Sequence, residues 1–138
     1  MRKLIFLLFL FCGFATLHAD SIDVYHVYYH GKKVAEFNEQ QTIRLIVQSD
    51  SIGPKDSLIV KVYRDASCSN CSYTMLVFGG KGPILVDTTQ RTQNFAIPLA
   101  LLLAEKKATG QKVFHGYYTE FFEGSNKSRV VSFEVRLE

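Results

Sequence analysis

Apolar and polar residues alternate along several stretches of this chain, which is the pattern of β-strands that bury one face. The clearest stretches are residues 42–48, 57–64 and 129–138. In the first of them, Ile43, Leu45 and Val47 are predicted to face the interior and Arg44 to face solvent, with Ile46 as an apolar exception on the outer side. Each stretch should therefore contribute one face to a hydrophobic core.

Further stretches are rich in the β-branched and aromatic residues that strands favour. They cover residues 22–29, 33–37, 73–78, 84–87, 95–97 and 111–122. Turn formers separate them, for example His30-Gly31-Lys32 and the glycine-rich run 79–83. That run lacks the Lys-Ser/Thr ending of a phosphate-binding loop, so we interpret it as a connection between strands.

One helix is predicted, at about 98–108. Pro98 suits a first helical turn, and the leucines, alanines and charged residues that follow are strong helix formers. Leu99, Leu102 and Leu103 fall on one stripe, whereas Glu105, Lys106 and Lys107 are expected to remain solvated. Thr109-Gly110 should end the helix, which would then cover one end of the sheets.

These elements predict an all-β fold, a β-sandwich of about 7–8 antiparallel strands with one short connecting helix. The pattern resembles immunoglobulin-like and fibronectin-like sandwiches over residues 20–138. The marker residues of antibody domains are missing, because the chain has no Trp and no pair of widely spaced cysteines after residue 19. The resemblance therefore concerns the arrangement of strands and not membership of a particular family.

The first nineteen residues have the composition of a secretory signal peptide. Arg2 and Lys3 precede an apolar run at 4–14, and Ala19 offers a small residue at the expected cleavage site. The apolar run is too short to span a bilayer. Cys12 follows bulky residues, which argues against lipid attachment. We expect residues 20–138 to form one periplasmic or secreted domain without membrane insertion.

Cleavage also changes the charge balance. The whole chain has 16 Lys and Arg against 13 Asp and Glu, so losing Arg2 and Lys3 leaves 14 against 13, a net charge of +1. The remaining basic residues are dispersed along the chain. Neither nucleic acid nor an anionic membrane is therefore an expected partner.

Cys68 and Cys71 form a C-x-x-C motif in a polar loop between two predicted strands. In an oxidising compartment such a pair is expected to form a disulfide, which would pin the loop. Two alternatives remain open: a redox-active pair, or a metal site completed by a distant histidine. The first lacks the helix that usually follows a redox motif, and the second lacks a further ligand pair.

No catalytic grouping is recognisable. His26 and His30 lie about 13 Å apart if the strand is extended, so they cannot both bind one metal ion. His115 is isolated, and the carboxylates are scattered. We therefore predict a protein that is not an enzyme and has no cofactor and no metal site.

The tyrosines are the stronger indication of function, because this side chain combines a large contact area with a polar tip. We predict that a protein or glycan partner in the cell envelope binds Tyr25, Tyr28, Tyr29, Tyr117 and Tyr118. The alternative is that these side chains fill a small sandwich. Residues 22–29 are the predicted edge strand at which a partner strand could pair. A third possibility is an inhibitor that inserts loop 65–71 into an extracellular hydrolase.

Overall fold

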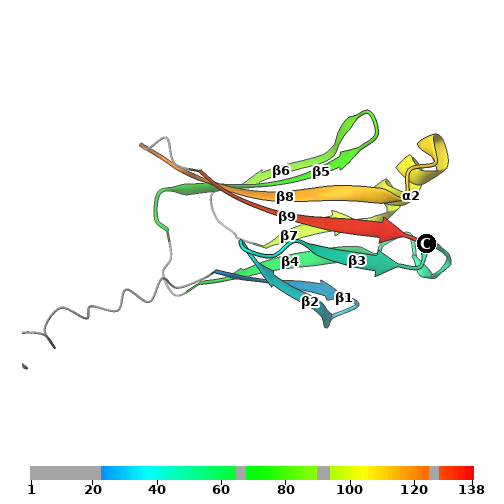
Figure 1. The fold of residues 1–138 in the computed structure, drawn as a ribbon, viewed down its shortest axis with the longest axis horizontal. Coiled ribbons are helices and arrows are strands. Elements are labelled where there is room, and N and C mark those ends of the chain that lie inside the picture. Colours follow the sequence, from blue (N-terminus) through cyan, green and yellow to red (C-terminus); the bar gives the residue numbers. More distant parts are fainter. Residues whose placement is uncertain (1–22, 65–67, 90–93, 125–127) are drawn as a thin grey trace, which may run out of the picture.

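The structure is a computed structural model of the 138-residue chain and describes residues 23–64, 68–89, 94–124 and 128–138. The predicted signal peptide and residues 65–67, the first three of the predicted loop 65–71, lie outside these ranges. Within them the chain forms two facing β-sheets and one α-helix (Figure 1). The predicted all-β sandwich with one short helix is confirmed, with nine strands in the described residues where about 7–8 were predicted.

The four-stranded sheet has the order β2-β1-β4-β7. Its strands are β1 (Val24–Tyr29), β2 (Lys32–Asn38), β4 (Ser57–Tyr63) and β7 (Phe95–Pro98). The five-stranded sheet has the order β3-β9-β8-β5-β6. Its strands are β3 (Ile43–Val47), β5 (Cys71–Gly79), β6 (Gly82–Thr89), β8 (Val113–Phe122) and β9 (Ser128–Leu137).

Two details of the predicted topology are wrong. β3 pairs with β9 in parallel, from Ile43 opposite Phe133 to Val47 opposite Leu137, whereas all strands were expected to be antiparallel. β1, which covers most of the predicted edge at residues 22–29, lies between β2 and β4 and is therefore not an edge. β2 folds back onto β1 through a tight hairpin and occupies that edge itself.

The core lies between the sheets, and aromatic rings are its largest side chains. Tyr25 stacks on Phe37 and meets Tyr118 edge-on, with 5.2 Å between ring centroids in both pairs. Phe37 in turn lies 5.7 Å from Phe133 of the opposite sheet. All four side chains are almost fully buried. Rings of this size contribute much of the hydrophobic stabilisation in a domain with one core.

Helix α2 (Leu99–Thr109) confirms the predicted element, and a short 3₁₀ turn (Ser49–Ser51) lies near it. Leu99 and Leu102 are fully buried, and Gly110 ends the helix in the left-handed conformation at φ 77°. The expectation that Lys106 is solvated is wrong. Its ammonium donates to Ser49 Oγ at 2.6 Å, so the helix is fastened to the turn that follows β3. No helix in the described part of the chain has the length and apolar character that crossing a bilayer requires.

Gly116 on β8 leaves room for the Phe133 ring, which comes from the neighbouring strand β9 of the same sheet and lies opposite Gly116 in the strand register. A Cβ atom built at this position would lie 2.2 Å from Phe133 Cζ, closer than any real contact. The Phe133 ring is fully buried and packs against Phe37, so it has no room to withdraw.

We expect Gly116→Ala to lower the free energy of unfolding by roughly 1–3 kcal/mol because it overpacks the core. Urea denaturation measures this change. The control is Gly80→Ala, where a new Cβ meets only the end of the Gln111 side chain, which can move away. Equal stability of the two variants would show that the Phe133 ring can shift.

Candidate functional site

A groove opens between β2 and β3, the outermost strands at the same side of the two sheets. An edge strand leaves backbone N–H and C=O groups without a ladder partner on its outer side. Residues 39–42 carry the chain from one strand to the other, so the groove runs between two neighbouring edges. Its volume is about 510 Å³, within the range of ordinary ligand-binding pockets.

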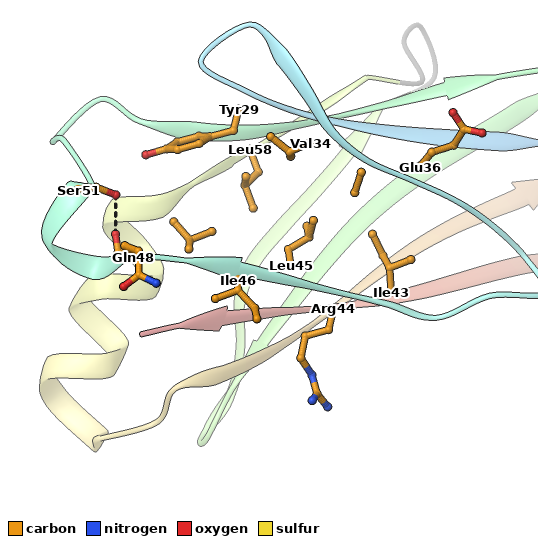
Figure 2. A pocket seen from close by; sticks show the side chains of 12 residues that line it. Tyr29, Val34, Glu36, Ile43, Arg44, Leu45, Ile46, Gln48, Ser51 and Leu58 are labelled. Carbon is orange, nitrogen blue, oxygen red and sulfur yellow. Dashed lines mark hydrogen bonds between the residues drawn. The ribbon is translucent and has the colours of Figure 1, made fainter.

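The walls of the groove are mainly apolar (Figure 2). They are lined by Tyr29, Val34, Ala35, Glu36, Ile43, Arg44, Leu45, Ile46, Val47, Gln48, Ser51 and Leu58. Figure 2 shows Val34 and Leu45 directed from opposite walls into the space, whereas Arg44 points away from it. The charged groups therefore lie at the rim, and the interior suits an apolar side chain.

A β-bulge places Val34 at the mouth of this groove. The β1–β2 register pairs Val27 with Ala35 and Tyr28 with Lys33, which leaves Val34 as the extra residue. A bulge redirects the side chains next to it, and Val34 remains 50% exposed. An apolar side chain with that exposure is available for contact with a ligand.

The carboxylate of Asp56 holds the hydroxyl of Tyr29, which lines the groove. It accepts hydrogen bonds from the Gly53 amide at 2.9 Å and the Tyr29 hydroxyl at 3.0 Å, and His30 Nε2 lies 3.0 Å away. The Gly53 amide and then His30 hold the pKa of Asp56 below its ordinary value. These contacts fix the turn before β4 against the β1–β2 hairpin.

The five predicted partner-binding tyrosines do not form one surface. Tyr25 and Tyr118 are fully buried between the sheets, so their assignment to partner binding is wrong. Burial raises the pKa of both phenols far above the ordinary value. Tyr29 lines the groove, whereas Tyr28 and Tyr117 lie on the outer faces of the four- and five-stranded sheets.

Tyr117 belongs to a shallow apolar hollow on the five-stranded sheet. Its ring meets Phe78 edge-on at 5.6 Å, and Leu76, Thr119 and Val130 complete the hollow. On the other sheet, the Tyr28 hydroxyl lies 3.2 Å from that of Tyr63 and 3.4 Å from His26 Nδ1. Tyr63 was not predicted. It lies two residues after Lys61 on β4 and therefore on the same outer face, which is the signal that could have identified it.

Cys68 and Cys71 form the predicted disulfide. Their loop joins β4 in one sheet to β5 in the other, so the bridge lies where the chain crosses between layers. The third metal-ligating group nearby is Glu120 and not a histidine: one of its oxygens and the two sulfurs lie within 4.8 Å of one another. Residues 65–67, on which the hydrolase-inhibitor hypothesis depends, lie outside the described residues.

A buried ion cluster lies beside the disulfide. Arg64 donates to both oxygens of the fully buried Glu120, at 2.5 and 3.0 Å, and pairs with Asp23 at 2.9 Å. Arg129 also pairs with Asp23. Burial disfavours the charge of Arg64, but the attraction of Glu120 and Asp23 outweighs burial and raises its pKa. Sequence analysis missed this cluster. Glu120 lies two residues after Tyr118 on β8 and therefore faces the same side of the sheet, which is the signal that could have identified it.

We expect Arg64→Met to lower the free energy of unfolding by about 3–5 kcal/mol, because Glu120 would lose its partner inside the protein. The matched control is Arg44→Met, which breaks the exposed pair with Glu134 and should cost less than about 1 kcal/mol. Urea denaturation of both variants makes the comparison. Equal losses would mean that burial does not distinguish the two pairs.

Replacing Cys68 and Cys71 together by serine should lower the free energy of unfolding by about 2 kcal/mol. The loss is small because a bridge across so short a loop restricts the unfolded chain only slightly. Reduction of the wild-type protein should produce the same change. A much larger loss on either route would indicate that the bridge also holds the neighbouring ion cluster in place.

No protein-family model matches this chain, and a search of curated proteins finds no significant match.

Proposed function

We propose that this protein is a non-enzymatic binding module of the periplasm or cell exterior, and that it holds an extended polypeptide segment in the groove between β2 and β3. The observation that carries the proposal is that two edge strands, β2 and β3, lie on either side of an apolar groove. The disulfide fits an oxidising compartment, as does the predicted signal peptide.

The edge of β3 suits the addition of a partner strand better than the edge of β2. β3 is regular through its five residues, whereas the bulge at Val34 interrupts β2. A segment paired with β3 would extend the five-stranded sheet, and every second side chain would enter the groove. Backbone hydrogen bonds would supply affinity, and the apolar walls at Val34 and Leu45 would select the side chains.

The composition of the groove favours a polypeptide over a glycan. Sugar rings are commonly held against exposed aromatic faces, but Tyr29 is the one aromatic residue in the lining. The unpaired edge instead offers alternating donors and acceptors at the spacing of a β-strand. The preferred ligand is therefore an extended segment with apolar residues at alternate positions.

Selection of random displayed peptides against the protein should enrich sequences with this alternation. A synthetic peptide from the selection should bind Val34→Glu at least about tenfold more weakly, because the new carboxylate would be desolvated at the groove mouth. The matched control is Val86→Glu. Val86 is 61% exposed and also lies on an edge strand, β6, but on the far side of the five-stranded sheet.

N-methylation of alternate peptide amides tests strand pairing separately, since it removes donors to β3 and leaves the side chains unchanged. Isothermal titration calorimetry should then detect no binding. The proposal fails if selection yields no alternating peptides, if both glutamate variants bind equally, or if the methylated peptide keeps its affinity.

A further inference from the structure

We propose that Tyr28, Tyr63 and His26 form a binding site for ferric iron on the outer face of the four-stranded sheet. β1 contributes His26 and Tyr28, which lie two residues apart on one face, while Tyr25 and Val27 face the core. Tyr63 comes from the adjacent strand β4 and is 46% exposed. The three proposed ligands are not among the residues that line the proposed peptide groove; Glu36, which contacts His26, also belongs to that lining.

Three donor atoms converge at this place. The hydroxyl oxygens of Tyr28 and Tyr63 lie 3.2 Å apart, and His26 Nδ1 lies 3.4 Å from the Tyr28 oxygen. Neighbouring ligands of a metal ion bonded at 2.0–2.1 Å lie roughly 3 Å apart. The Tyr28 oxygen is therefore at the spacing of neighbouring ligands from both the Tyr63 oxygen and the His26 nitrogen, and the exposure of Tyr63 gives an ion access from solvent.

The surroundings of His26 match those of a metal-binding histidine. Its Nε2 lies 3.1 Å from Glu36 Oε2, and Lys33 holds the same oxygen at 2.8 Å. A ligating histidine usually donates its second ring N–H to a carboxylate, which fixes the tautomer and orients the ring. With the proton on Nε2, the lone pair of Nδ1 is free to face the Tyr28 hydroxyl.

The donor set selects the ion. Phenolate is a hard oxygen ligand that proteins use for iron, and imidazole also suits iron. Binding of Fe³⁺ replaces the two hydroxyl protons, which leave to solvent, and gives an Fe–(O-Tyr)₂ unit with a net charge of +1. A divalent ion has less charge with which to displace the two phenol protons.

Lys61 supplies a further element of the site. It lies opposite His26 in the strand register, and its ammonium is 4.9 Å from the centre of the Tyr28 ring. A positive charge at the rim favours a small chelating anion in the open coordination positions. The bound species would therefore be ferric iron together with an anion.

The test titrates the protein, freed of any affinity tag, with ferric nitrilotriacetate. We expect one iron per chain and a visible phenolate-to-iron charge-transfer band. Tyr28→Phe and Tyr63→Phe, which keep the rings, should each abolish the band. Tyr117→Phe, an accessible tyrosine on the other sheet, should leave it unchanged. Glu36→Ala should weaken binding by about 10–100-fold, as expected for a carboxylate that orients a ligand.

Circular dichroism of each variant confirms that the fold is kept, and these substitutions, at exposed or partly buried positions, should not disturb it. Absence of the band in the wild-type protein overturns the proposal. So does a band of equal strength in Tyr28→Phe, Tyr63→Phe and Tyr117→Phe, since iron would then be bound elsewhere. Loss of iron binding with unchanged peptide binding in Tyr63→Phe would separate this site from the groove.

Discussion

The guanidinium of Arg64 joins the two sheets at the end of the sandwich that carries the disulfide. It extends from the end of β4 in the four-stranded sheet to Glu120 on β8 in the five-stranded sheet, and it also holds Asp23 at the start of β1. Three charges inside a protein are tolerated only when each has a partner in good geometry. This requirement fixes the relative position of three strands.

At the opposite end of the sandwich, the sheets are covered by the apolar side chains of a helix and not by an ion cluster. Helix α2 buries Leu99 and Leu102, and Lys106 reaches Ser49 in the turn after β3. The groove opens along the side where β2 and β3 face each other. Both are edge strands, and within the described residues no further strand pairs with their outer sides.

The sequence predicts the layers of this fold well, because strand alternation is a local signal. The inward positions of β3 and β9 and the leucine stripe of α2 follow directly from it. Edge strands could not be predicted, since they depend on which distant strand pairs with which. Alternation also cannot decide which face is buried where both are aromatic, as in β1, and for that reason Tyr25 was misassigned.

The same limits apply to the sites. The Cys68–Cys71 bridge was predictable from spacing and the expected compartment. The groove was not, because it is made by the edges of two different sheets and by a bulge at Val34 that has no marker in the sequence. Tyr63 approaches Tyr28 only because β1 and β4 are neighbours with a particular register.

The parallel pairing of β3 with β9 has a consequence for assembly of the molecule. Ile43 pairs with Phe133 and Val47 with Leu137, and the backbone of Glu138 exchanges hydrogen bonds with Val47 and Ser49. One wall of the groove is therefore held in place by the last strand of the chain. Pairing segments so distant in sequence carries a loop-closure cost in entropy, so this parallel pair should limit the folding rate more than the local hairpin of β1 and β2 does.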